Sequence, residues 1–421
     1  MTKPNVLQEL EWRGFVQQAT PGLDAHFAKG PVTAYCGFDP TVSSLQVGNL
    51  MPLMLLANLQ RHGHRPIVLM GGGTGLIGDP SGKSTERPLL SKEEIRENVR
   101  RMRDQSSRIL EFGAGPTAAL LLDNAKWLTE QRLIDFLRDI GKHFTVNVMM
   151  QKESVKARLD AGISFTEFSY MLLQAYDFLH LFRERQCTLQ VAGSDQWGNI
   201  TAGIELIRRV ANAEAHGLVS PLVTRASGQK FGKTESGAVY LDPQMTSPYK
   251  FYQFWINVDD RDVEAYLKLF TLKSRSEIEE LAAQQKKNPA ARPAQRALAA
   301  DVTARVHGAE VVTGVQAASN ILFGDEQAEV HPQVFDVLAG EIPTVVVEGD
   351  SEVPLVDLVA RAGLAKSKSE ARRSIEQGGI YVNQQRIDDV ARTIATGDWI
   401  GGRNLLLRKG KKEYALLRRG S

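Results

Sequence analysis

The sequence predicts an α/β protein whose parallel-sheet domain is followed by a helical region and a small basic α+β module. Short β-type runs at residues 33–38, 66–70 and 188–191 alternate with longer helical patterns, as in βαβ units. Each of these runs ends in a loop rich in glycine and polar residues. The carboxyl end of a parallel strand is a favoured position for a ligand site.

Composition limits the class of protein. The chain has 421 residues, enough for two or three domains, with 43% hydrophobic and 24% charged residues, as in ordinary soluble proteins. No window resembles a membrane span or a secretory signal, so we expect a cytoplasmic protein without a membrane partner. Two cysteines, Cys36 and Cys187, cannot build a disulfide framework or a zinc cluster, and no tightly bound metal is expected.

The small net charge of +2 hides an uneven distribution. Residues 353–421 hold 14 Lys and Arg against 7 Asp and Glu, a net of +7, whereas the other 352 residues hold 37 against 42, a net of −5. A basic terminal module on a mildly acidic body suggests an anionic polymer as partner. A basic surface that serves only solubility is the alternative.

The stretch 33–50 joins a β-type run to a helix. The run breaks at Asp39-Pro40, continues through Thr41 and two serines, and enters a helical pattern that contains Gly48. A strand, a tight loop and a helix can direct free backbone N–H groups at a phosphate. Most such units are only packed, so this stretch alone is a weak indication.

A second strand candidate, residues 66–70, leads into a glycine-rich run at 71–83. Many glycines allow close approach of a ligand to the backbone, and Asp79, Lys83 and Arg87 add charge of both signs. The spacing of glycine and lysine excludes a P-loop. A flexible surface loop is the alternative, but charges directly after a hydrophobic strand favour a ligand site.

The remaining elements before residue 187 are predicted mainly as helices. Residues 1–30 suggest one amphipathic helix before a Pro-Gly turn, 46–62 a buried helix and 91–112 a charged helix with a capping box. Within the helical stretch 129–182, Tyr170, Gln174 and Asp177 share one face among apolar residues. Polar groups there need partners, either a ligand or an internal hydrogen-bond network.

The third strand candidate ends near Gly193 and Asp195. An acidic residue at the carboxyl end of a parallel strand suits the hydroxyls of a ribose. A further strand is predicted at 218–223, and a glycine-flanked loop with Lys230 and Lys233 follows. Lysines on a loop are usually only solvated, so a phosphate-binding role for them depends on the surrounding pattern.

The amino-acid composition changes twice after residue 246. Residues 247–323 are helix-rich, and 324–352 are acidic and contain prolines, which suggests a linker. In the basic module, residues 369–375 predict a short helix with one basic face, followed by a Gly-Gly turn and a hairpin. Such a module can meet RNA through its shape and phosphate charge.

Together these motifs resemble bacterial-type tyrosyl-tRNA synthetases, a family of class I aminoacyl-tRNA synthetases, over essentially the whole chain. The motifs that carry the resemblance are Tyr-Cys-Gly-Phe-Asp-Pro-Thr at 35–41, the Gly-Asp-Pro-Ser-Gly-Lys run ending at Lys83, Tyr170 with Gln174 and Asp177, Gly-Ser-Asp-Gln-Trp-Gly-Asn at 193–199, and Lys-Phe-Gly-Lys-Thr at 230–234. The basic module resembles the S4-type RNA-binding domain of such enzymes. The resemblance implies a Rossmann-like catalytic domain, then a helical domain and an S4-like domain.

The resemblance also implies roles for individual residues. Those expected to bind tyrosine are Tyr35 and Asp177 at the phenol, Asp79, Tyr170 and Gln174 at the ammonium, and Gln196 near the carboxylate. Those expected to bind ATP are Gly37, Asp39, Gly48, Asn49, Gly193, Asp195 and Lys233. Those expected in catalysis are Thr41, Gln46, Lys83, Arg87, Lys230 and Lys233, and those expected to bind RNA are Lys368, Arg372 and Arg373.

The implied reaction is activation of L-tyrosine by ATP, accompanied by Mg²⁺, followed by transfer of the tyrosyl group to tRNA(Tyr). No covalent protein nucleophile is needed, so catalysis would come from positioning and from neutralising phosphate charge. A homodimer is implied by the family only. We predict a Rossmann-like catalytic domain over 1–223, a mobile lysine loop and helical domain over 224–323, a linker over 324–352 and an S4-like domain over 353–421.

One motif departs from the family. The expected signature at 46–49 is His-Ile-Gly-His or a near variant, whereas this chain has Gln46-Val47-Gly48-Asn49. Glutamine can donate to a phosphate oxygen but cannot become cationic. Two alternatives to an active tyrosine–tRNA ligase follow: a catalytically weakened paralogue that acts as an RNA-binding protein, and an enzyme that passes tyrosyl-adenylate to another acceptor.

Overall fold

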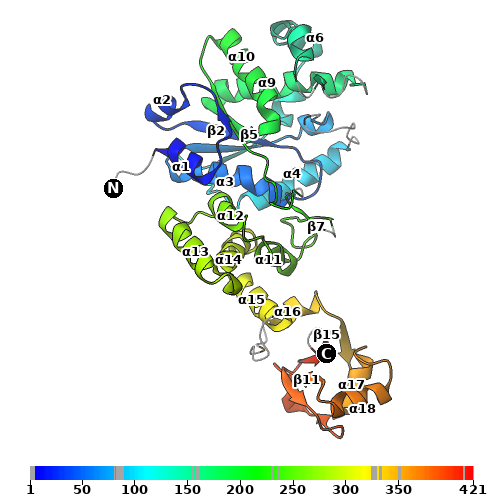
Figure 1. Cartoon of the computed structure of the whole chain (residues 1–421). Coiled ribbons are helices and arrows are strands. Elements are labelled where there is room, and N and C mark those ends of the chain that lie inside the picture. The colour runs from blue at the N-terminus through cyan, green and yellow to red at the C-terminus, as the bar shows by residue number, and fades with distance from the viewer. Residues whose placement is uncertain are drawn as a thin grey trace. The chain divides into compact units, whose positions relative to one another are not determined.

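The computed structural model describes residues 5–79, 81, 90–152, 155–156, 162–228, 231–234, 237–323, 330, 334–348, 352–410 and 413–420. The contacts between residues divide the chain into two compact units (Figure 1). Unit 1 comprises Met1–Met245 with Asn257–Val302, and unit 2 comprises Thr246–Ile256 with Thr303–Ser421. The domain boundaries predicted from the sequence stay a prediction.

Unit 1 is built on a six-stranded sheet with the order β1-β6-β5-β2-β3-β4. Its strands are β1 (Gln18–Ala19), β2 (Thr33–Phe38), β3 (Arg65–Met70), β4 (Leu120–Asp123), β5 (Cys187–Gly193) and β6 (His216–Ser220). All neighbours pair in parallel except the short edge strand β1, which confirms the predicted parallel sheet. β3 and β4 follow β2 on one side of it, and β5 and β6 then add on its other side. The direction in which strands are added therefore reverses between β2 and β5. Ligands of open α/β sheets bind at such a reversal.

Helices cover both faces of this sheet, which explains why its central strands are almost wholly apolar (Figure 1). The helices of unit 1 are α1 (Val6–Arg13), α2 (Leu23–Ala28), α3 (Val47–Arg61), α4 (Lys92–Ser106), α5 (Ala125–Leu128), α6 (Leu133–Asp139), α7 (Val146–Met150), α9 (Phe165–Arg185), α10 (Trp197–Ala211), α12 (Val263–Phe270) and α13 (Arg275–Lys287). One core cluster joins Tyr35 and Ile67 of the sheet to Phe178 and Leu179 of α9. Among the described residues, no helix has the length and apolar composition needed to cross a membrane.

Two predicted boundaries were wrong for local reasons. The single N-terminal helix ends at Arg13, because Gly14 adopts φ +88° and its N–H caps the last turn. The strand predicted at 218–223 instead spans His216–Ser220. Pro221 has no backbone N–H to continue the ladder.

Unit 2 combines helices with a five-stranded sheet of order β12-β11-β14-β15-β9. Its helices are α11 (Pro248–Ile256), α15 (Ala309–Phe323), α16 (Val334–Ala339), α17 (Leu355–Arg361) and α18 (Lys368–Glu376), and α14 (Pro293–His307) crosses the boundary between the units. Its strands are β9 (Thr344–Val347), β10 (Val353–Pro354), β11 (Ile380–Val382), β12 (Gln385–Ile387), β13 (Thr393–Ile394), β14 (Asn404–Lys409) and β15 (Glu413–Arg419).

The core of unit 2 lies between this sheet and the pair α17 and α18. Leu355, Leu358 and Ile375 of the helices pack against Leu405 and Leu417 of the strands. β9 pairs in parallel with β15, so the stretch interpreted as a linker contains a strand of this sheet. A pairing between residues some 70 positions apart leaves no local sign in the sequence.

Candidate active site

A cavity of about 990 Å³ opens in unit 1 at the carboxyl ends of the strands. It lies where the strand order reverses, between β2 and β5. Most residues to which the resemblance gave a role line it: Tyr35, Gly37, Asp39, Thr41, Gln46, Gly48, Asn49, Asp79, Tyr170, Gln174, Asp177, Gly193, Asp195 and Gln196. Lys83, Arg87 and Lys230 lie outside the described residues. The individual roles stay predictions.

A buried carboxylate lies at one end of the cavity, and each of its two oxygens accepts a hydrogen bond. Asp177 of α9 accepts a hydrogen bond of 2.7 Å from Trp127 Nε1 and one of 2.8 Å from Asn124 Nδ2. Asn124 is fixed in turn, because its Oδ1 accepts from Gly73 N at 2.7 Å and its Nδ2 lies 3.0 Å from Thr74 Oγ1. Each Asp177 oxygen keeps a second acceptor site for a further donor.

A tyrosine hydroxyl without a partner lies at this end of the cavity. Tyr35 of β2 is 1% exposed, and its Oη has no hydrogen-bond partner among the described residues. A buried hydroxyl without a partner costs free energy. A ligand that carries its own hydroxyl can satisfy both Tyr35 and Asp177, so this pair suits a phenol.

Burial raises the pKa of Asp177 to about 7, although the hydrogen bonds from Asn124 and Trp127 oppose the shift. The charges of Asp39 and Asp123 raise it further. The folded-state pKa therefore exceeds the ordinary value of 3.8. The folded state favours the protonated form, and that contribution to stability is lost as the pH rises through the folded pKa.

A pH dependence of stability follows from this shift. Between about pH 5.5 and about pH 8, we expect the ligand-free parent to lose roughly 1–2 kcal/mol of unfolding free energy relative to Asp177→Asn, which has no carboxyl to ionise. Urea unfolding followed by tryptophan fluorescence at both pH values measures the difference. Parallel pH profiles of the two proteins would show that Asp177 titrates as an ordinary aspartate.

Removing the hydroxyl of Tyr35 should stabilise the ligand-free protein and weaken its binding of tyrosine. We expect Tyr35→Phe to raise the unfolding free energy of the ligand-free protein by about 1 kcal/mol, because no buried hydroxyl is left unpaired. The same change should weaken tyrosine binding by about tenfold. Thermal unfolding and equilibrium dialysis measure the two effects, and a loss of both stability and affinity would contradict this account of Tyr35.

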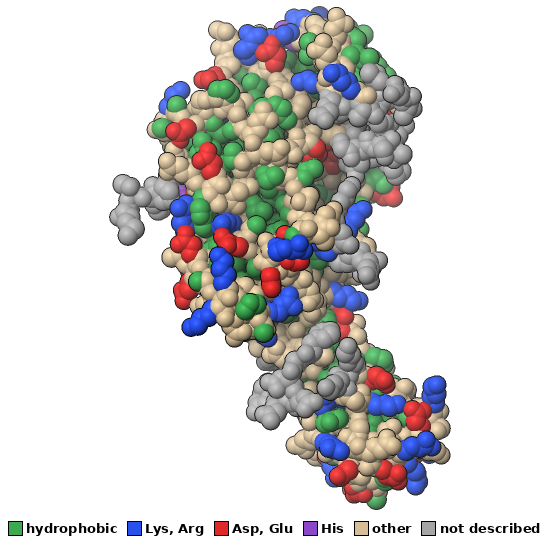
Figure 2. Space-filling model, viewed as in Figure 1, with side chains coloured by type: hydrophobic (Ala, Val, Ile, Leu, Met, Phe, Trp, Pro, Cys, Tyr) green, Lys and Arg blue, Asp and Glu red, His purple; other side chains and the backbone are tan. Residues whose placement is uncertain are grey.

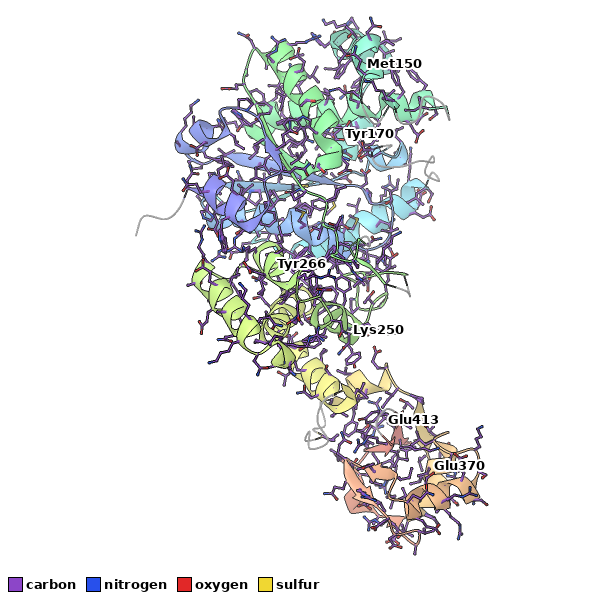
Figure 3. All side chains as sticks on the ribbon, in the orientation of Figure 1. Met150, Tyr170, Lys250, Tyr266, Glu370 and Glu413 are labelled. Carbon is purple, nitrogen blue, oxygen red and sulfur yellow. The ribbon has the colours of Figure 1, made fainter. Side chains whose placement is uncertain are left out.

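The next part of the cavity is acidic. Asp79 accepts from Gln196 Nε2 at 2.8 Å and from Ser81 N at 2.9 Å. Tyr170 of α9, labelled in Figure 3, is buried beside three carboxylates. Burial raises its pKa well above the ordinary value, and the charges of Asp39, Asp79 and Asp177 add to the effect. A negative field of this kind favours a cationic group such as an ammonium.

The region beside β2 and β5 leaves space next to the backbone. A Cβ built on Gly37 or Gly48 would meet nothing within 4 Å, so the cavity reaches the main chain there. A Cβ on Gly193 would lie 2.7 Å from Asp195 Oδ1, so a side chain at this position would displace that carboxylate. Asp195 follows the carboxyl end of β5, as the sequence predicted. Its carboxylate accepts from Gln196 Nε2 at 3.1 Å.

The divergent signature forms the start of α3. Gln46 precedes the helix, and its N–H donates to Asn49 Oδ1 at 2.9 Å. Both side chains line the cavity. Lys233 lies on the short strand β7 (Lys233–Thr234), which pairs with β8 (Gly237–Ala238). Its side chain is exposed.

The structure adds cavity residues to which the sequence gave no role. Asn124 and Trp127 hold Asp177 from outside its helix, and only the fold brings them there. Gln190 lines the cavity next to Tyr35 in the sheet, is 2% exposed and has no partner for its Oε1 among the described residues. A glutamine within the apolar run of β5 was the signal that could have revealed it, because buried amides need partners.

The predicted RNA-binding residues lie on α18 in unit 2. The Arg372 and Arg373 side chains are exposed and form no ion pair with any described residue, whereas Lys368 pairs with Asp357 at 2.8 Å. Glu370, labelled in Figure 3, accepts from Lys409 at 2.9 Å. On the face drawn in Figure 2, basic and acidic side chains are mixed over this unit, so the positive charge is locally offset.

Comparison with known proteins agrees with this geometry. A family described as tRNA synthetases class I (W and Y) matches residues 28–324, and a tyrosine–tRNA ligase SYY-like C-terminal domain matches 334–417. The chain is 53% identical to the tyrosine–tRNA ligase of Roseiflexus castenholzii, covering 98% of this chain and 99% of that one. This chain belongs to the tyrosyl-tRNA synthetase family.

Two further members of the tyrosyl-tRNA synthetase family are also similar to this chain. The tyrosine–tRNA ligase of Geobacillus stearothermophilus is 49% identical and covers 98% of this chain and 99% of its own length. The solved C-terminally truncated mitochondrial tyrosyl-tRNA synthetase of Aspergillus nidulans has a TM-score of 0.70, with 30% identity, over 76% of this chain and 95% of that one. The predicted family and fold class are thereby confirmed.

Proposed function

We propose that this chain is a tyrosine–tRNA ligase that activates L-tyrosine with ATP and transfers the tyrosyl group to tRNA(Tyr). The observation that carries the proposal is the buried pair at the end of the cavity. Asp177 is oriented by two donors, and the Tyr35 hydroxyl nearby has no hydrogen-bond partner in the described part of the chain. A phenol satisfies both groups, whereas phenylalanine would leave them unpaired. Discrimination of about 10⁵ against phenylalanine is already known for this enzyme class.

In the first step, a carboxylate oxygen of tyrosine bonds to the α-phosphorus of ATP. The bond from that phosphorus to the bridging oxygen breaks, and pyrophosphate leaves with the electron pair. We assign Asp79, Tyr170 and Gln174 to the ammonium and Asp39 and Asp195 to the adenosine. In the second step, a terminal ribose hydroxyl of tRNA attacks the tyrosyl carbonyl and AMP leaves. Positioning by these residues is the main catalytic contribution, because no protein atom becomes bonded to substrate.

The charge that develops on the phosphates needs cations. We assign this role to Lys83, Arg87, Lys230 and Lys233, with Thr41 and Gln46 as hydrogen-bond donors. Mg²⁺ enters as the ATP complex, as part of the substrate. The cavity carboxylates Asp39 and Asp195 are assigned to the nucleotide rather than to a resident metal.

Pyrophosphate exchange tests the activation step directly. Purified protein at micromolar concentration is incubated with ATP and labelled pyrophosphate, with tyrosine, with phenylalanine or with no amino acid. We expect label in ATP with tyrosine only. Exchange without amino-acid dependence, or no exchange at all, would overturn the proposal.

The Gln46 position offers a gain-of-function prediction. A charged donor to phosphate stabilises by about 1–2 kcal/mol more than a neutral one, so Gln46→His should raise the exchange rate by about 5- to 30-fold. The increase should diminish above about pH 7, where imidazole loses its charge. An unchanged rate at about pH 6 would show that glutamine does not limit the chemistry.

We infer a homodimer from exposed apolar side chains on α6, on α7 and at the start of α9. Leu133, Ile134 and Phe165 are 69%, 72% and 77% exposed, and α7, whose last residue Met150 is labelled in Figure 3, adds exposed Val146 and Val148. An exposed apolar surface of this kind is typical of a partner interface. Analytical ultracentrifugation at micromolar concentration should report twice the mass of the chain.

We assign tRNA binding to unit 2, with Lys368, Arg372 and Arg373 contacting phosphates. The exposed positions of the two arginines support this role, and a family match over 334–417 supports the module. We place the protein in the cytoplasm, where its proposed tRNA, ATP and tyrosine substrates meet.

A further inference from the structure

Two segments that face ATP in the proposed reaction are joined by a short antiparallel ladder. Residues 45–47, around Gln46, lie against residues 239–241, which follow the hairpin of Lys233. Val47 N donates to Val239 O at 3.0 Å, and Leu241 N donates to Leu45 O at 2.8 Å. Gln46 and Tyr240 form the bridge between them. We call residues 45–47 the signature turn and residues 239–241 the base of the Lys233 hairpin. These two segments are therefore joined by backbone hydrogen bonds.

A side chain from a third element holds this ladder. Gln105, in the last turn of α4, accepts from Leu45 N at 2.8 Å through Oε1. Its Nε2 donates to Ser44 Oγ at 3.1 Å. A single amide thus contacts two consecutive residues directly before Gln46. Gln105 is not among the residues that line the cavity, so any effect on the reaction must pass through the turn.

Ser44 extends the contact to the other side of the ladder. Ser44 is 1% exposed. Its hydroxyl donates to Leu45 O at 2.8 Å and accepts both from Gln105 Nε2 and from Asp242 N at 3.1 Å. One donor and two acceptor sites are the full capacity of a serine hydroxyl. Leu45 is 1% exposed, and the acceptor that its N–H has among the described residues is Gln105 Oε1, so loss of Gln105 would leave this buried N–H unpaired.

The same helix reaches the ladder a second time. Arg101, one turn before Gln105, lies 3.9 Å from Asp242. The hairpin packs closely on the turn, since a Cβ on Gly232 would lie 2.9 Å from Val47 Cγ2, and Gly232 O accepts from Val239 N at 3.0 Å. A shift of residues 45–47 would therefore move Gly232, the residue before Lys233.

We propose that Gln105 is a positioning residue for the ATP step, setting the turn that carries Gln46 together with the base of the Lys233 hairpin. This inference rests on the proposed function. It extends that function, because a residue of α4 outside the cavity would then influence how efficiently ATP reacts. Because the phenol and ammonium ends of the cavity belong to other elements, tyrosine binding should not depend on Gln105.

The test compares Gln105→Ala with the parent in tyrosine-dependent pyrophosphate exchange and in tyrosine binding by equilibrium dialysis. We expect kcat/KM for ATP to fall about tenfold, the effect of two lost hydrogen bonds, and the tyrosine Kd to stay within about twofold. Gln105→Glu keeps an acceptor for the Leu45 N–H but cannot donate to Ser44. Its kcat/KM for ATP should therefore lie between the values of the parent and of Gln105→Ala. Gln284→Ala is the matched control, because Gln284 is exposed and, among the residues that the structure describes, its side-chain amide reaches only Glu280.

A second variant keeps the test informative if Gln105→Ala fails to fold. Ser44→Ala removes the acceptor shared by Gln105 and Asp242, and the same selective loss toward ATP is expected. In the double variant the two losses should not add, since both break one network. Unchanged ATP kinetics in both single variants, or an equal loss of tyrosine affinity, would overturn the inference. A parent without exchange would instead refute the proposed function.

Discussion

Replacing Lys233 with alanine should lower kcat for tyrosine-dependent pyrophosphate exchange by about 10²–10³-fold, the effect of losing one donor to developing charge. Lys233 is exposed on β7, next to the ladder that joins its hairpin to the signature turn. In the proposed mechanism its ammonium meets the phosphates mainly in the transition state. The tyrosine Kd should therefore not change, and stopped-flow fluorescence of adenylate formation separates binding from chemistry.

The matched control for this prediction is Lys92→Ala. Lys92 is also an exposed lysine of unit 1, and neither it nor Lys233 is among the residues that line the cavity. Lys92 differs from Lys233 in its position, because it lies at the start of α4 and not on the hairpin joined to residues 45–47. Its loss should change the exchange rate by less than about twofold. If the two variants behaved alike, Lys233 would be a solvated surface lysine without a catalytic role.

Asp177→Asn should reduce the preference for tyrosine over phenylalanine by about 100-fold in kcat/KM, from the loss of a charge-assisted hydrogen bond. The two oxygens of Asp177 accept from Trp127 and Asn124, so an amide there would set its own N–H₂ against one of these donors. The phenol would lose its acceptor, and activation of phenylalanine should change little. Exchange kinetics with both amino acids measure the ratio.

An exposed aspartate provides the comparison for this variant. Asp104→Asn on α4 makes the same chemical change at a position outside the cavity and should leave the ratio unchanged. An Asp177→Asn enzyme that still rejects phenylalanine as strongly as the parent would contradict the assignment of the phenol site.

The candidate site could be predicted largely because its residues follow strands of one parallel sheet. Asp39 comes directly after β2, and Asp195 follows β5 after a single serine. Tyr170, Gln174 and Asp177 of α9 were visible as polar residues at helical spacing. Their sharing of one cavity follows from the reversal of strand order, which the structure shows.

The supporting contacts could not be predicted, because they join elements that are distant in sequence. Asn124 reaches Asp177 from the end of β4, and Gln105 reaches Ser44 from the end of α4. Neither residue departs from what its own helix or loop would accept, so local pattern gives no sign of either contact. The parallel pairing of β9 with β15 escaped prediction for the same reason.

Aminoacylation tests the central claim most directly. The parent protein is incubated with ATP, labelled tyrosine or labelled phenylalanine, and a tRNA(Tyr) transcript, and labelled tRNA is collected by acid precipitation. We predict charging with tyrosine, none with phenylalanine, and loss of charging in Lys233→Ala. Pyrophosphate exchange with tyrosine but no charged tRNA would contradict the claim and would indicate another acceptor for the adenylate.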